Sequence, residues 1–470
     1  MANDPIYDPS KFAEDASAKF AKKYPHRHDH FATRPHLSRR NFFQLAGAGV
    51  VGSYLAQPVH ASEILSQAGA VTQNKAKYCI YIHLQGAISH LDTFDLKVTN
   101  GVTPSKFAPA LINGINFPTG LLPKLATQVP NLAIVRSVSA WALVHTLATQ
   151  WAQIGRNPVA ALGDIAPNIG SVVAIEKDVQ RTSTQVFPAF VALNTSSGAA
   201  NGYFPATYAP FRVAETSRTT STGVNNTTNV TGQTNFNTMF SRLHTLDDPL
   251  RKSSPYGQSL SDYDAFYSLA QKMMYNNDVT TAFNFTVADS QRYGSSSFGN
   301  ACLVAKQVLA ANQGTRYVQI TYGSWDMHND IYGNQNPNGN NLFTLSPAFD
   351  DGVSALLTDL KSSGLLDQTL IVMVGEFGRT PTTEGSNGRD HNHFGHCMWM
   401  AGAGVRPGMA YGATDDFGFR AVQGRVHVHD LHATILHLMG LDHEQLTYRY
   451  AGRDYRLTDI AGRVVHEVLG

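Results

Sequence analysis

Three short segments of this sequence bring carboxylates together with histidine or arginine. They are Asp326-Met327-His328, Glu376 to Arg379, and Asp390-His391. Carboxylates and imidazoles are ligands for divalent Zn, Mn, Fe, Mg or Ca. A metal held by such groups would polarise a phosphoryl or sulfuryl oxygen and acidify a bound water. The guanidinium of Arg379 adds a planar fork of donors that suits a tetrahedral oxyanion.

Each segment taken alone also has a simpler interpretation. Glu376 and Arg379 could pair with each other or cap a helix. Asp326 could be a turn residue beside Gly323, and His391 a hydrogen-bonded loop histidine. Three such segments at successive strand ends favour a functional site over three unrelated coincidences.

The elements that must position these segments alternate between strands and helices. Predicted strands cover 77–84, 132–138, 187–193, 318–322 and 370–374, and predicted helices cover 145–154, 170–175, 265–275, 302–311 and 348–362. Such alternation indicates a mostly parallel sheet covered by helices on both faces. In these sheets the chemistry lies at the carboxyl ends of the strands, where the polar segments fall. We therefore expect one α/β domain over residues 62–470, with insertions.

A second group of histidines lies near the C-terminus. It comprises His427, His429, His432 and His437. Val426–Val428 is a predicted strand, and Asp430 is the predicted N-cap of a helix over 431–439. His432 and His437 would then lie too far apart around that helix to share one ion readily. The pattern favours a structural role for this group.

Composition excludes several classes of protein. The chain has 470 residues, a net charge of +1, 43% hydrophobic residues and 15% charged residues. This balance gives no basic surface for nucleic acid and enough apolar material for a large core. Residues 1–61 carry a net charge of +3 and the remainder −2. Recognition of an anion must therefore come from a local site.

Residues 1–61 are typical of a cleaved export signal. Arg39-Arg40 precedes Phe42 and Phe43, and an uncharged stretch runs from there to Ser62. Val59-His60-Ala61 supplies small residues at the positions expected before a cleavage site. This pattern indicates a signal peptide read by the twin-arginine translocation machinery. A membrane anchor is the alternative, because the stretch is just long enough to span. We expect a periplasmic, extracellular or cell-surface protein.

Two compositional features indicate how the rest of the chain is built. Cys79, Cys302 and Cys397 are too few and too far apart for a disulfide framework, and no Cys-x-x-Cys zinc motif occurs. Residues around 213–240 are rich in Thr and Asn with almost no charge. That composition predicts a surface insertion or lid within the single domain.

Several longer motifs carry a family resemblance. Residues 430–441 resemble the terminal helix motif of sulfatases. Four further segments are similar to an exported, sulfatase-like bacterial family (domain of unknown function 1501). They are residues 89–95, 376–381, 388–391 and 411–415. This family belongs to the alkaline phosphatase superfamily. The resemblance covers the mature chain and implies a three-layer α/β/α sandwich with a mostly parallel central sheet.

The resemblance also implies roles for individual residues. Counting back ten residues from Gly155 puts His145, followed by Thr146, at the position of the superfamily's nucleophile; cysteine, which formylglycine requires, is absent there. Gln85 stands where the first-strand metal aspartate is expected, and Glu376-Phe377 where an Asp-His pair is expected. The implied catalytic residues are His145, Thr146 and Arg379. The implied metal residues are Asp92, Asp326, His328, Glu376, Asp390 and His391.

Two functions follow from these residues. The first is a metal-dependent hydrolase of small anionic phosphate or sulfate esters, in which His145 attacks or binds metal. The second is a non-catalytic relative that binds a secreted partner or takes part in assembly at the cell surface, because several positions depart from the superfamily's pattern. An unrelated peptidase is disfavoured, since no His-Glu-x-x-His or Gly-x-Ser-x-Gly motif is present.

Overall fold

The computed structural model describes residues 72–470 apart from 101, 160–164, 196–197, 214–230 and 252–256. The predicted signal peptide and most of the Thr/Asn-rich insertion therefore lie outside the described residues. The described end of that insertion is helical, because helix α7 begins at Gln233 and runs to Arg251. No helix in the described part of the chain is long and apolar enough to cross a membrane.

A nine-stranded sheet forms the centre of the structure. Its order is β12-β4-β11-β8-β1-β7-β5-β6, with β15 also paired to β4. The strands are β1 Tyr78–Leu84, β4 Leu132–Ser139, β5 Phe190–Leu193, β6 Phe211–Val213, β7 Tyr317–Tyr322, β8 Thr369–Val374, β11 His396–Gly402, β12 Met409–Tyr411 and β15 Val426–His427. All pairings are parallel except those of β11 with β4 and β8. The carboxyl ends of β1, β4, β7 and β8 therefore share one edge.

The sheet separates two hydrophobic cores. Alternate residues of β1 point to opposite faces: Ile80 and Ile82 join one core, whereas Cys79 and Tyr81 join the other. Every residue of β1 and β8 is buried, as expected for central parallel strands. All three cysteines are buried and free.

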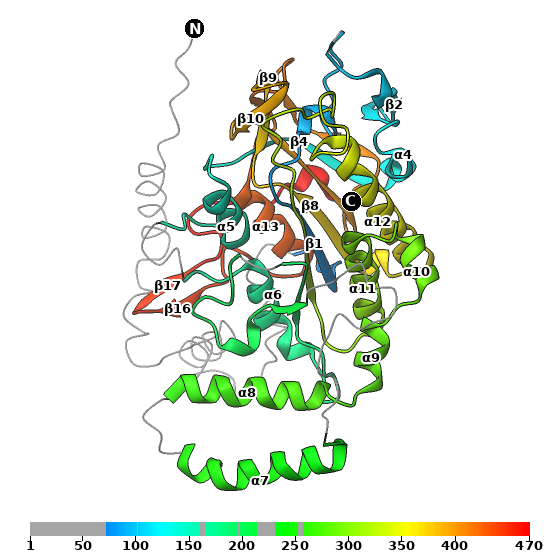
Figure 1. Ribbon diagram of the computed structural model, residues 1–470. Coiled ribbons are helices and arrows are strands. Elements are labelled where there is room, and N and C mark those ends of the chain that lie inside the picture. The colour runs from blue at the N-terminus through cyan, green and yellow to red at the C-terminus, as the bar shows by residue number, and fades with distance from the viewer. Residues whose placement is uncertain (1–71, 101, 160–164, 196–197, 214–230, 252–256) are drawn as a thin grey trace.

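Helices cover both faces of the sheet, as Figure 1 shows. The first core includes side chains of α11 (Ser297–Ala310) and α12 (Leu342–Ser362), and the second includes those of α6 (Ile169–Lys177) and α13 (Val428–Leu438). The predicted three-layer α/β/α architecture with a mostly parallel sheet is confirmed. The other helices are α4 Pro123–Ala126, α5 His145–Ile154, α8 Gly257–Met273, α9 Asn277–Phe283 and α10 Val287–Arg292.

Four two-stranded sheets lie outside the central sheet in the described part of the chain. They are β2 Pro109–Ile112 with β3 Ile115–Pro118, β9 Gly378–Glu384 with β10 Gly388–Asn392, β13 Ala413–Thr414 with β14 Ala421–Gln423, and β16 Tyr448–Tyr450 with β17 Arg453–Tyr455. The hairpin β9–β10 follows β8 and carries several candidate site residues.

The predicted start of the last helix was wrong. We expected Asp430 as the N-cap, but His427 is the N-cap and Asp430 lies three residues inside the helix. The Asp430 carboxylate accepts a hydrogen bond from the His427 backbone N–H at 2.9 Å. Asp430 thus completes a capping box instead of starting the helix.

Candidate metal centre

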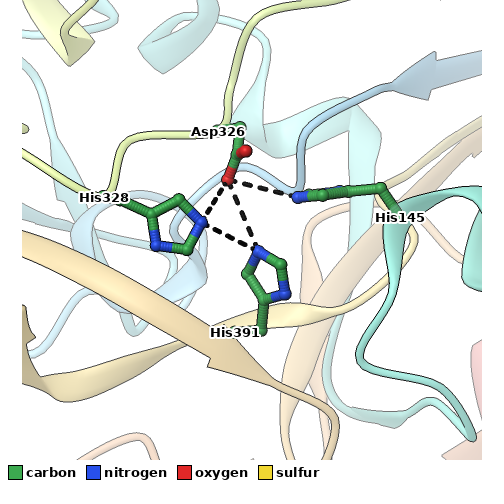
Figure 2. Close-up of side chains that lie close together, drawn as sticks. All are labelled: His145, Asp326, His328 and His391. Atoms are coloured by element: carbon green, nitrogen blue, oxygen red, sulfur yellow. Dashed lines mark hydrogen bonds and ion pairs between the residues drawn. The ribbon is translucent and has the colours of Figure 1, made fainter.

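Four side chains from distant parts of the sequence meet at the carboxyl edge of the sheet. They are His145, Asp326, His328 and His391, which point toward one another in Figure 2. His145 is the first residue of α5, Asp326 and His328 follow β7, and His391 belongs to β10. Two of the predicted segments, Asp326–His328 and Asp390–His391, thus lie together at this edge, with His145 beside them.

Oδ1 of Asp326 is the common point of the cluster. It lies 3.2 Å from Nε2 of His145, 2.9 Å from Nε2 of His328 and 3.5 Å from Nε2 of His391. The Nε2 atoms of His328 and His391 are 3.0 Å apart. Four ligands in a tetrahedron around zinc at 2.0–2.1 Å would be separated by about 3.3 Å. The cluster therefore has the dimensions of a single-ion site.

The opposite ring nitrogen of each histidine donates to an oxygen. Nδ1 of His145 donates to Glu376 at 2.7 Å, Nδ1 of His328 to Glu384 at 2.5 Å, and Nδ1 of His391 to the backbone carbonyl of Leu143 at 2.5 Å. Carboxylates and carbonyls only accept, so each Nδ1 carries a proton. In the neutral rings each Nε2 then carries a free lone pair. Metal-bound histidines are commonly oriented in this way, with the other ring nitrogen donating to an oxygen.

These lone pairs are available to a metal ion. Nε2 of His145 is buried and makes no hydrogen bond of acceptable geometry, although the Asp326 oxygen is only 3.2 Å away. Around it, the carboxylates of Asp326, Glu376 and Glu384 face one guanidinium, that of Arg379. These four charged groups sum to −2, and Asp390, which lies close to His328 and Glu384, adds a further negative charge. A divalent cation between the Nε2 atoms and Asp326 fits both the donor set and the charge.

Local sequence explains how Asp326 and His328 reach the site. The segment after β7 alternates, with Trp325 and Met327 buried and the two polar side chains on the other side. Gly86 makes this path possible, because a Cβ on its backbone would lie 2.6 Å from the Asp326 nitrogen. Its φ of +99° also favours glycine.

The β9–β10 hairpin brings Arg379 beside His391. These residues are direct cross-strand partners, and the register shifts between Arg389 and His391. Asp390 is the residue at this irregularity, and its side chain is exposed. A bulge of this kind redirects neighbouring side chains, so His391 joins the cluster while Asp390 does not. Asp390 instead groups with His328 and Glu384.

Arg379 lies differently from the sequence prediction. We expected it to bind an oxyanion, but its side chain is 1% exposed and its guanidinium is occupied. Its four hydrogen bonds run to the carbonyls of Gly86, Ala87 and Arg389 and to the carboxylate of Asp326. Arg379 therefore holds Asp326 in place.

Glu376 orients His145 and is not among the four clustered side chains. Its Oε1 accepts from His145 Nδ1 and, at 2.8 Å, from the Gly86 backbone N–H. Burial alone would raise the pKa of Glu376, but these hydrogen bonds and the nearby His83 lower it. Burial lowers the pKa of His145, whereas Glu376 and Asp326 outweigh it, so that this pKa is raised overall. A proton and a metal therefore compete for Nε2 of His145.

The pKa values of two clustered groups, Asp326 and His391, are lowered. Burial raises the pKa of Asp326, but the hydrogen bond and charge of Arg379, with His145 and His328, bring it to about 2. Burial and the nearby positive charges lower the pKa of His391, despite its hydrogen bond to Leu143. Asp326 is thus ionised and His391 neutral near pH 7, the states that metal binding requires.

Two predicted site residues lie elsewhere, and one contributor was missed. Asp92 is buried in a salt bridge with Arg389, whose Nε is 2.6 Å from its carboxylate, and it also accepts from Tyr332 at 2.7 Å. Thr146 is exposed on the first turn of α5 and is not among the clustered groups. Glu384 was not predicted, because only the turn of the hairpin carries it back to His328.

The fold and site define an α/β protein with a candidate metal centre of three histidines and one aspartate. The chain belongs to the family described as Protein of unknown function (DUF1501), whose profile matches residues 76–469. No curated protein matches the chain.

Three solved structures are similar over most of this chain. A sulfatase from Pseudoalteromonas sp. is 12% identical, covering 81% of this chain and 70% of that one, with a TM-score of 0.37. A phosphonate monoester hydrolase from Silicibacter pomeroyi is 13% identical, covering 84% and 76%, with a TM-score of 0.38. An alkaline phosphatase from the Antarctic bacterium TAB5 is 12% identical, covering 78% and 98%, with a TM-score of 0.37.

Proposed function

We propose that this protein is a metal-dependent hydrolase of phosphate or sulfate esters, with the metal held by His145, Asp326, His328 and His391. The convergence of three Nε2 atoms on one carboxylate oxygen carries the proposal. A bound divalent metal would supply Lewis acidity toward an ester oxygen and would acidify water. The sulfatase-like family resemblance supplies the ester class.

The residues of this chain prepare such a centre in two ways. Glu376 fixes the tautomer and orientation of His145, and Arg379 fixes Asp326 and keeps it ionised. The cluster is also open to solvent, because the side chains of Asp326 and His328 are 40% and 33% exposed. A small anionic ester can therefore reach the cluster from the side of Asp326 and His328.

Of the two roles considered for His145, attack on the ester and metal binding, the geometry favours metal binding. Its Nε2 faces Asp326 and its Nδ1 is bound to Glu376, which is the setting of a ligand. None of the four clustered side chains is a hydroxyl or a thiol. We therefore favour direct attack by water over a covalent enzyme intermediate.

A panel of chromogenic phosphate monoesters, phosphate diesters and sulfate esters tests this function. The mature protein would be assayed with each of Zn, Mn, Fe, Mg and Ca. We expect turnover that is lost in His328→Ala and retained in a matched control, His466→Ala, which lies outside the cluster. Turnover that is equal in both variants, or absent with every metal and ester, would contradict a hydrolytic site.

The occupied guanidinium of Arg379 favours one alternative, a non-catalytic protein that binds a partner through the same centre. Stoichiometric metal binding without turnover on the full panel would support it. In either case we propose export by the twin-arginine route, on the strength of the leader over residues 1–61. Replacement of Arg39-Arg40 by Lys-Lys should then leave the protein inside the cell.

A further inference from the structure

Two cationic side chains are buried at the amino edge of the central sheet, opposite the candidate metal centre. Lys177 is the last residue of α6 and is 4% exposed, and Arg316 directly precedes β7 and is 3% exposed. The six residues of β7 alone separate Arg316 from the carboxyl edge by roughly 20 Å. In Figure 1, α6 lies well below the β9–β10 hairpin that carries His391. The two cations are therefore distinct from the metal centre.

Neither cation has a carboxylate as its partner. In the part of the chain that the structure describes, no carboxylate lies within ion-pair distance of Lys177 or Arg316. Nη1 of Arg316 donates to the carbonyl of Thr315 at 3.4 Å, whereas its Nε is buried and has no hydrogen-bond partner among the described residues. Lysine and arginine are almost never fully buried unless they are paired. This edge of the sheet therefore holds positive charge that the described residues do not compensate.

The acidic side chains of this region are engaged elsewhere. Asp178 pairs with Arg181, whose Nη1 lies 3.2 Å from its carboxylate. Glu176 accepts a hydrogen bond from the hydroxyl of Tyr448 at 2.9 Å. Together with the two buried cations, these three charged groups sum to +1.

The three cations of this region are close enough to repel one another. Burial lowers the pKa of Lys177 to about 8, and the charge of Arg316 contributes more to this than the opposing charge of Glu176. Burial also lowers the pKa of Arg316, and the charge of Arg181 acts in the same direction, against the opposite effect of Tyr78. Lys177 thus still carries its charge near pH 7. Like charges in a partly dehydrated site destabilise one another unless an anion joins them.

We propose that the end of α6 and the loop before β7 bind a tetrahedral oxyanion, phosphate or sulfate, through Lys177 and Arg316. The guanidinium of Arg316 provides a planar set of donors that includes its unpartnered Nε, and Lys177 adds a compact positive charge. The carboxyl end of α6 offsets part of the Lys177 charge, which allows the protein to fold before the anion binds.

Burial selects a small anion over an acidic segment of another protein. Because the two cations are only 4% and 3% exposed, a bulky chain cannot cover them, whereas an inorganic ion can reach the tips of their side chains. The site does not depend on the proposed hydrolysis, since it lies at the opposite edge of the sheet.

Calorimetric titration of the mature protein with sodium phosphate and with sodium sulfate, at constant ionic strength in chloride, tests the site. We expect saturable binding of at least one of the two anions, with a dissociation constant on the order of millimolar. Added zinc should leave the sulfate affinity unchanged. Lys177→Met and Arg316→Met should each weaken binding by about 10-fold or more. The matched control is Lys361→Met, because Lys361 also lies in the last turn of a helix, α12, but is exposed.

Thermal unfolding distinguishes loss of the site from loss of the fold. In chloride, Lys177→Met should unfold at a higher temperature than the wild type, since it removes an unpaired buried charge. Phosphate or sulfate should then raise the unfolding temperature of Lys361→Met more than that of Lys177→Met, because a general salting effect acts on both variants alike. A lower unfolding temperature of Lys177→Met in chloride would contradict the premise that this charge is uncompensated.

Three results would overturn the proposal. The first is a wild type that binds neither anion saturably, and the second is binding that Lys177→Met and Arg316→Met leave intact. The third is binding that appears only with added zinc and is abolished by His328→Ala, which would place the anion at the metal centre. None of these measurements requires turnover, so their failure is separate from failure of the proposed hydrolysis.

Discussion

Two groups of histidines in this protein contain the same side chains in opposite settings. His145, His328 and His391 are partly exposed, and their Nε2 atoms converge on the carboxylate of Asp326. In the C-terminal group, His427 and His429 pack against Trp141, whose ring centroid lies 3.5 Å from that of His427 and 4.3 Å from that of His429. Among the described residues, the groups suited to a metal include the first three histidines but none of the C-terminal histidines.

The difference shows what distinguishes a candidate metal centre from packed histidines. Burial lowers the pKa of His429 to about 3 and that of His432 to about 4, so both stay neutral without any ligand. His432 also donates from Nε2 to the carbonyl of Ala152 at 2.8 Å. The decisive features are therefore a shared carboxylate and an oxygen acceptor behind each ring. The number of histidines in a group does not by itself indicate a metal centre.

The largest predicted effect separates the two groups directly. His391→Ala should weaken metal binding by about 100-fold or more, because a ligand is lost, with little change in folding stability. His432→Ala should leave metal affinity unchanged but lower the free energy of unfolding by about 2–4 kcal/mol, because it opens a buried cavity and leaves a carbonyl unpaired. Calorimetric titration measures the metal affinity of each variant, and urea unfolding measures its free energy of unfolding. Equal effects on metal affinity would remove the distinction.

The second prediction concerns Arg379. Arg379→Gln should lower the free energy of unfolding by about 3 kcal/mol, because it leaves three backbone carbonyls and the Asp326 carboxylate without their donor. Urea unfolding of the metal-free protein measures this loss. If Arg379 instead bound the substrate, the variant would raise KM while its unfolding midpoint stayed at the wild-type value.

The third prediction compares two carboxylates that orient histidines. Glu376→Gln should weaken metal affinity by about 10–100-fold, because a neutral amide fixes the His145 tautomer less well. Glu384→Gln should have a smaller effect, since the Glu384 side chain is 43% exposed and water can replace it, whereas that of Glu376 is buried. Competition against a fluorescent chelator gives both affinities. A larger effect at Glu384 would contradict this ranking.

The last prediction is a pH dependence of stability in the metal-free protein. Below its usual pKa of about 6.5, His432 takes up a proton in the unfolded chain but not in the folded one until about pH 4. The free energy of unfolding should therefore fall as pH drops through this window. His432→Gln, which keeps a donor for Ala152, should show a shallower slope. An identical slope would show that other groups dominate.

Much of this arrangement could be predicted from the sequence because its signals are local. The helix His145–Ile154 begins and ends where predicted, and buried apolar runs gave the strands whose ends carry Asp326 and Glu376. The role of Arg379 could not be predicted, because it depends on carbonyls some 290 positions earlier in the chain. Asp92 and Glu384 depend in the same way on a hairpin register that local composition does not encode.

Elemental analysis of the purified mature protein tests the central claim most directly. The wild type should hold about one divalent ion per chain, as a single centre of three histidines and one aspartate requires. An Asp326→Asn, His391→Ala double variant, shown to be folded by circular dichroism, should hold none. A folded wild type that takes up no metal from any supplement, or a double variant that retains the full complement, would contradict the account.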